Sequence, residues 1–152
     1  TNVSKAMFYS CPNLELIYAP NVLRIEDGYL DEKNAVYGSF IGTALTDICF
    51  PKLLYAGTLA FLLCQQAINV DIPLCEEVAE STFRQCPMIK VMSLPRVKTV
   101  GVWCFGGCSS MTDLNIPNAN SVGKNCIYQC TSLKSINCKL EAENFICDDS
   151  DC

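Results

Sequence analysis

Apolar residues recur along this chain at a fixed interval of 22 residues, marked most clearly by Pro51, Pro73, Pro95 and Pro117. An aromatic or isoleucine residue follows ten positions after each proline, and a cysteine follows three positions later. The two series are Phe61, Phe83, Phe105 and Ile127, and Cys64, Cys86, Cys108 and Cys130. A unit of this length cannot bury its own apolar face, so the period predicts a solenoid of stacked coils with one continuous core.

Within each unit the spacing predicts a short strand that ends at the proline. Met92 and Leu94 alternate with polar residues, as do Leu114 and Ile116. Proline has no N–H to donate, so it would end the strand. We expect these strands to form a parallel sheet with about 4.8 Å between coils. The apolar pair after the proline predicts a second, shorter extended piece, and the Phe-x-x-Cys-x-x-Leu segment predicts a turn or one helical turn.

Two departures from the period predict where the coils become irregular. Ten extra residues separate Pro20 from Phe40 and cover roughly residues 26–38, with Asp27, Asp31, Glu32 and Lys33 among them. Insertions in solenoids fall between coils, often on a binding face. At the other end, polar Lys139, Glu141 and Asn144 occupy positions that are apolar or proline in earlier coils. Val3 and Phe8 mark an incomplete preceding coil. We therefore expect one domain, residues 1–152, of about six coils with an irregular end at 139–152.

The segment from Cys104 to Gly123 shows the unit most fully, as Cys-Phe-x-x-Cys-x-x-apolar-x-x-Leu-x-Ile-Pro-x-Ala-x-x-Val-Gly. This pattern resembles the BspA-like (bacterial surface protein A-like) class of leucine-rich repeats over about residues 3–139. Thr43, in place of a cysteine, and the insertion depart from it. The resemblance implies a β-rich α/β leucine-rich-repeat solenoid, a right-handed superhelix with a parallel sheet of short strands. Known relatives are mainly surface or secreted proteins that bind host proteins or other cells, with some intracellular examples. The family carries no catalytic motif.

Composition narrows the function further. The chain has 152 residues, half of them apolar, a net charge of −5 and no basic cluster, so nucleic acid and anionic membranes are not expected partners. Histidine is absent, which excludes Ser-His-Asp and Cys-His catalysis. The longest apolar run, residues 53–64, is shorter than the roughly 20 residues that cross a bilayer. We expect no enzyme activity, no cofactor and no membrane insertion.

Twelve cysteines raise the question of metal or redox chemistry. Cys104, Cys108, Cys126 and Cys130 are spaced like a four-thiolate zinc site, which stays a less favoured alternative. The repeat accounts for them as stacked positions in which cysteine acts as a small buried apolar residue. Stacked side chains keep Cβ atoms about 4.8 Å apart, rather than the roughly 3.8 Å of a disulfide, so free thiols are expected. The tail from Cys147 to Cys152 is expected to be a solvated acidic end.

Outward positions of the strands are the best candidates for binding, because inward positions are committed to packing. They form a small, polar and mildly acidic concave face. The candidate binding residues are Tyr18, Asp47, Asn69, Asp71, Ser93, Asp113, Asn115 and Asn137. The only tryptophan, Trp103, is expected at a convex edge rather than in a ligand cage.

The function expected from these features is a non-enzymatic module that binds a protein or glycan through the concave face. It would belong to a cell-surface or secreted protein acting in adhesion or host interaction. An intracellular (cytoplasmic) protein-interaction scaffold with reduced cysteines is the alternative. Uncovered solenoid ends also allow self-association.

Overall fold

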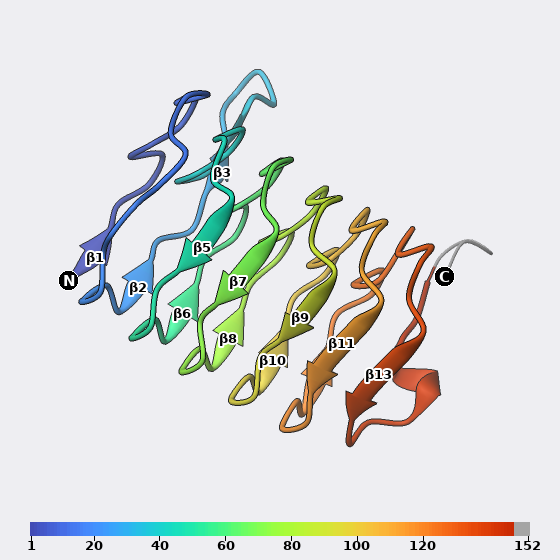
Figure 1. The fold of residues 1–152 in the computed structure, drawn as a ribbon. Helices are drawn as coiled ribbons and strands as arrows, with labels where there is room; N and C mark the ends of the chain where they lie inside the picture. Colours follow the sequence, from blue (N-terminus) through green and yellow to red (C-terminus); the bar gives the residue numbers. More distant parts are fainter. Residues whose placement is uncertain (148–152) are drawn as a thin grey trace.

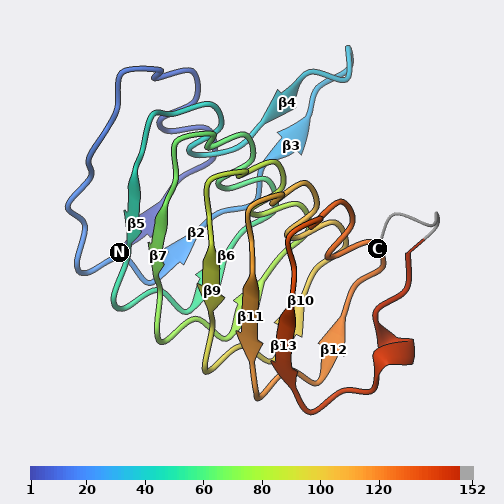
Figure 2. The ribbon, with the colours of Figure 1, turned by 45° about the vertical axis from the view of Figure 1, so that its right-hand side comes forward.

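The structure is a computed structural model that describes residues 1–147. The chain winds into coils that stack side by side from the N-terminus to the C-terminus (Figure 1). Turned by 45°, the stack shows short strands along two of its sides and turns along a third (Figure 2). The β-rich solenoid with coils of about 22 residues is confirmed. Within residues 1–147, helix is limited to one 3-10 segment, η1 (Ala142–Asn144).

The strands that precede the prolines lie along one side of the solenoid. They are β5 (Asp47–Cys49), β7 (Asn69–Asp71), β9 (Val91–Ser93), β11 (Asp113–Ile116) and β13 (Ser135–Cys138). All pairings are parallel and join residues 22 apart, for example Asp47 with Asn69 and Asp113 with Ser135. The ladder is interrupted once, because β5–β7 and β9–β11–β13 form separate sheets. The predicted period is therefore also the register of the sheet.

The second, shorter extended piece of each coil builds the longer sheet. Its six parallel strands are β1 (Asn2–Val3), β2 (Arg24–Ile25), β6 (Tyr55–Ala56), β8 (Glu77–Val78), β10 (Thr99–Val100) and β12 (Ser121–Val122). Asn2 pairs with Arg24 and Val3 with Ile25, so the incomplete coil predicted at the N-terminus is present. Gly101 and Gly123 follow two of these strands where coils touch closely. A Cβ on either would lie 2.3 Å from the backbone of the preceding coil.

The third side consists of turns with an unusual backbone. Residues with positive φ recur twice in each coil, at Leu59 and Leu63, Ser81 and Gln85, Trp103 and Gly107, and Asn125 and Gln129. Left-handed conformations cost a non-glycine residue roughly 1–2 kcal/mol. Hydrogen bonds between coils hold them, since the Leu59, Ser81 and Trp103 N–H groups donate to Glu80, Val102 and Lys124 carbonyls at 3.0, 2.9 and 3.0 Å. The Phe-x-x-Cys-x-x-Leu segment is therefore a pair of turns.

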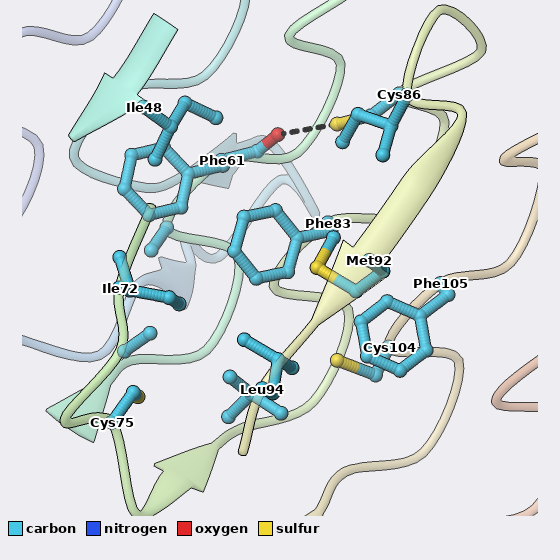
Figure 3. Close-up of a cluster of buried hydrophobic side chains, with 14 of the residues drawn as sticks. Ile48, Phe61, Ile72, Cys75, Phe83, Cys86, Met92, Leu94, Cys104 and Phe105 are labelled. Atoms are coloured by element: carbon cyan, nitrogen blue, oxygen red, sulfur yellow. Dashed lines mark hydrogen bonds between the residues drawn. The ribbon is translucent and has the colours of Figure 1, made fainter. Parts of the chain in front are cut away.

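A row of phenylalanine rings forms the centre of the core. Phe8, Phe40, Phe61, Phe83 and Phe105 stack in that order, with centroid separations of 5.1, 5.1, 5.3 and 6.2 Å. Apart from partly buried Phe8, these rings are fully buried. Figure 3 shows three of them in line, with the aliphatic side chains of the strands beside them. The ten-residue phenylalanine offset from the prolines thus produces one aromatic stack along the solenoid.

The predicted insertion forms a hairpin that projects from the stack (Figure 2). Its antiparallel strands are β3 (Tyr29–Leu30) and β4 (Val36–Tyr37). Asp31 holds the turn, because its Oδ1 accepts hydrogen bonds from the Lys33 and Ala35 N–H groups at 2.9 and 2.8 Å. At the other end of the chain, η1 replaces the second strand of the last coil, and Leu140 and Phe145 pack against the core. Residues 148–152 lie outside the described chain, so the expected acidic tail stays a prediction.

Replacing Phe83 with alanine tests the stack. Phe83 contacts a ring on each side, so Phe83→Ala should lower the free energy of unfolding by about 3–5 kcal/mol. Urea unfolding followed by circular dichroism measures the loss. Met88→Ala is the control in the same coil, because Met88 is 45% exposed and its loss should cost less than about 0.5 kcal/mol. Equal effects of the two substitutions would contradict a stacked core.

Candidate functional site

The outward side chains of β5, β7, β9, β11 and β13 form a continuous surface, here called the strand face. Seven of the eight candidate binding residues lie on it, in two columns. The first column holds Asp47, Asn69 and Asp113, and the second holds Asp71, Ser93, Asn115 and Asn137. Tyr18 is not brought into the sheet, because its segment makes no pairing with β5. Its side chain is 87% exposed, at the N-terminal margin of this surface.

Side chains on the strand face bond to their equivalents on the next strand. The Asn69 amide donates to Asp47 Oδ1 at 2.7 Å, and the Ser135 hydroxyl donates to Asp113 Oδ1 at 2.5 Å. In the second column, Asn137 Nδ2 donates to Asn115 Oδ1 at 2.8 Å, and Asn115 Nδ2 donates to Ser93 Oγ at 2.9 Å. The strand face is therefore a set of polar groups held in place before any partner binds.

The electrostatics of this face are acidic. Its outward columns contain Asp47, Asp71 and Asp113 and no basic residue. Hydrogen bonds from Asn69 and Thr46 lower the pKa of Asp47, and those from Ser135 and Thr112 lower the pKa of Asp113. Both carboxylates therefore stay ionised at neutral pH. Burial and then the Asp71 carboxylate raise the pKa of the Cys49 thiol, which donates to Asp71 Oδ2 at 3.7 Å.

Apolar contacts on this face were missed by the sequence analysis. Val91 opens β9 and is 54% exposed, and Ile68, which directly precedes β7, is 44% exposed. They lie at the break between the two sheets of the strand face. Leu16, 73% exposed, adds an apolar group near Tyr18. Val91 stands out in its column as the one aliphatic residue among polar ones on the strands, which is the signal that identifies it.

A second surface feature, also missed, is a hollow on the turn side, here called the turn groove. An open groove of about 960 Å³ includes Gln65, Pro87, Ser109 and Thr131 in its lining. A smaller hollow of about 240 Å³ adjoins it through three shared residues and is bounded further by Arg84, Trp103 and Tyr128. The shared residues are Gln85, Gly107 and Gln129.

Trp103 takes part in an ordered cluster at this groove. The Arg84 guanidinium lies 4.7 Å from the centre of the Trp103 ring, and Tyr128 meets it edge-on at 4.8 Å. Gly106 makes this possible, because a Cβ there would lie 3.1 Å from Trp103 Cε3. The tryptophan expected at an edge of the solenoid is thus part of the wall of a hollow.

The stacked cysteines act as hydrogen-bond donors. Cys64, Cys86, Cys108 and Cys130 each donate from Sγ to the carbonyl of the phenylalanine in the preceding coil, at 3.2 Å in every case. Figure 3 shows this bond from Cys86 to Phe61. Ten of the eleven cysteines among residues 1–147 are free thiols, and Cys147 is disulfide-bonded. Within these residues no group of three or more His, Cys, Asp or Glu is placed to hold a metal, so the zinc alternative finds no support there.

Burial raises the pKa of the core thiols well above the ordinary value of about 9. The pKa of Cys64 and of Cys75 is about 11, and the pKa of Cys126 and of Cys130 is about 12. These groups are neutral thiols at physiological pH, poor nucleophiles and poor metal ligands. The cysteine positions are structural.

The raised pKa values predict a loss of stability in alkali. Stability is fully present below pH 9, and falls as pH rises from about 9 towards 11–12, because the unfolded chain releases thiol protons that the folded chain keeps. Each buried thiol should contribute a slope of up to about 1.4 kcal/mol per pH unit, measurable by urea unfolding at several pH values. Cys86→Ala with Cys108→Ala should flatten this slope and exposed Cys49→Ala should leave it nearly unchanged. Equal slopes in all three proteins would refute the assignment.

Comparison with known proteins agrees with this geometry. A family model described as a BspA type leucine-rich repeat region matches residues 33–146 in six copies. No curated protein and no solved structure matches significantly. Among residues 1–147, no helix has the length and apolarity needed to span a bilayer. The match covers three quarters of the chain and repeats at the observed register, and the chain therefore belongs to the BspA-type leucine-rich repeat family.

Proposed function

We propose that this protein is a non-enzymatic module that binds another protein through its strand face. Its family is one of repeat modules for protein interaction, which supports this role. The observation that carries the choice of surface is the set of hydrogen bonds between neighbouring strands, from Asn69 to Asp47 and from Asn137 through Asn115 to Ser93. A surface ordered in advance loses little conformational entropy when a partner binds.

The chemistry of the face defines the partner. Three carboxylates without a basic neighbour in the outward columns attract lysine and arginine side chains. Val91 and Ile68 offer apolar contact at the centre of the face, and Tyr18 offers an exposed aromatic ring at its margin. The partner we infer is a protein segment that carries basic residues beside aliphatic or aromatic ones.

We place this module at a cell surface or in a secreted protein acting in adhesion. Buried, protonated core thiols support this placement, because thiols that are inaccessible and not ionised resist oxidation outside the cell. The ten free thiols equally favour a second candidate, an intracellular interaction scaffold. The two differ in the state of Cys49, Cys11 and Cys138, the thiols that are not buried. Mass spectrometry of protein isolated from its source with free thiols blocked separates them, since oxidised Cys49 favours the exterior and reduced Cys49 the cytosol.

Charge reversal tests the strand face. A displayed library of random peptides selected on the protein should enrich basic and aromatic sequences. The selected peptides should bind Asp71→Lys and Asp113→Lys variants at least about tenfold more weakly, because two attractions become repulsions. Binding is measured by biolayer interferometry, and thermal unfolding should change by no more than a few degrees because both side chains lie on the surface.

Glu77→Lys is the matched control for these variants. Glu77 is exposed on β8, in the other sheet, and its reversal makes the same change in net charge. Peptides that lose affinity equally for all three variants would respond to overall charge alone. Peptides unaffected by the Asp71 and Asp113 variants would reject this face as the protein-binding surface.

A further inference from the structure

We infer that the turn groove is a second binding site, separate from the strand face, and that it takes a neutral oligosaccharide. The groove lies on the side of the solenoid built from turns, and its lining comes from successive coils. Gln65, Gln85, Gly107 and Gln129 enter it from four consecutive coils. Three intervals of about 4.8 Å make this a path of roughly 14 Å, which suits an extended ligand rather than a compact one.

The polar groups of the groove are available to a ligand. Within residues 1–147, the side-chain amides of Gln65, Gln85 and Gln129 make no hydrogen bond to the protein, and neither does the Trp103 indole N–H. This contrasts with the strand face, where amides such as Asn69 bond to the next strand. A side-chain amide offers both donors and an acceptor, and so does each hydroxyl of a sugar. The groove therefore presents an unpaired set of groups that matches vicinal hydroxyls.

The charge of the groove favours a neutral ligand. Arg84 is the one charged residue among those that line the two hollows, and its guanidinium already lies over the Trp103 ring. The remaining polar lining consists of amides and hydroxyls, including Ser109 and Thr131. A strongly anionic or cationic ligand would find no free counter-charge there.

Apolar contacts complete the fit. Trp103 and Tyr128 form one wall of the smaller hollow, and Ile127 and Leu133 line the larger one. Sugar rings present C–H groups on one face and hydroxyls at their edge, so they use apolar and amide groups side by side. The floor between Gln85 and Gln129 is open because Gly107 has no side chain.

An extended peptide is a poorer occupant of the groove. Peptides that lie along a protein edge depend on unpaired backbone groups for their main-chain hydrogen bonds. On this side the backbone N–H groups are already used between coils, since Gln85 donates to the Gly106 carbonyl and Gly107 to the Tyr128 carbonyl, both at 2.7 Å. Side-chain amides are what the groove has left to offer, and these suit hydroxyl groups.

The test begins with an array of immobilised oligosaccharides, in which neutral hexose and N-acetylhexosamine chains stand beside sialylated and sulfated ones. We expect binding to one or more neutral chains. Trp103, the only tryptophan, lies in the wall of the smaller hollow, so its fluorescence reports occupancy directly when the selected oligosaccharide is titrated. A saturable change in emission is the expected result.

Substitutions then assign the site. Gln85→Met and Gln129→Met keep side-chain length while removing the amide, and each should weaken binding roughly tenfold. Thr131→Val is an independent variant in the larger hollow with the same expected direction. Gln66→Met is the matched control, because Gln66 is exposed and does not line the groove. Circular dichroism and the thermal midpoint of each variant establish that it is folded.

Three results would overturn the inference. One is an array on which no neutral chain binds, or on which only sialylated or sulfated chains bind. Another is binding that stays at full affinity in the folded Gln85 and Gln129 variants. The third is glycan binding that is lost in Asp71→Lys instead, which would move the ligand to the strand face. Peptide binding at the strand face has its own variants and probe, so the failure of one proposal leaves the other standing.

Discussion

The structure depends on one constraint, which is that every coil must satisfy its backbone and its apolar side chains at the same 22-residue interval. The phenylalanine stack and the thiol donors meet this constraint together. Cys86 Sγ donates to the Phe61 carbonyl, and the next thiol, Cys108, repeats the bond to Phe83. A cysteine at this position is small enough for the core and still supplies a weak donor to a buried carbonyl. Each coil is thus locked to its predecessor by a ring contact and a side-chain hydrogen bond.

This commitment of the interior determines where recognition is possible. Inward positions are occupied by the same residue types in coil after coil, so chemical variety is confined to the outward columns and the turn side. The two surfaces differ in state. The strand face has satisfied its amides internally and offers ionised carboxylates, whereas the turn groove keeps its amides unpaired. A repeat scaffold can in this way carry two kinds of site without altering its core.

The sequence predicts the periodic features well because they follow from a single repeating demand. The register, the strand before each proline and the extra coil at Val3 are all confirmed. The turn side was harder to predict, because left-handed Leu59 and Trp103 carry no glycine signal and are held by bonds between coils. The turn groove was missed for a related reason. It arises where Gly106 and Gly107 interrupt columns filled by larger side chains, so it reflects neighbours 22 residues away rather than any local motif.

Removal of whole and partial coils tests the account most directly. Deleting residues 84–105 removes 22 residues and joins Phe83 to Gly106 with every column still in phase, whereas deleting residues 84–94 shifts the columns by half a coil. If equivalent side chains stack from coil to coil, the first protein should keep its β-rich circular dichroism and unfold cooperatively in urea. The second should not fold. Similar behaviour of the two proteins, whether both fold or both fail, would contradict a solenoid held together by its 22-residue register.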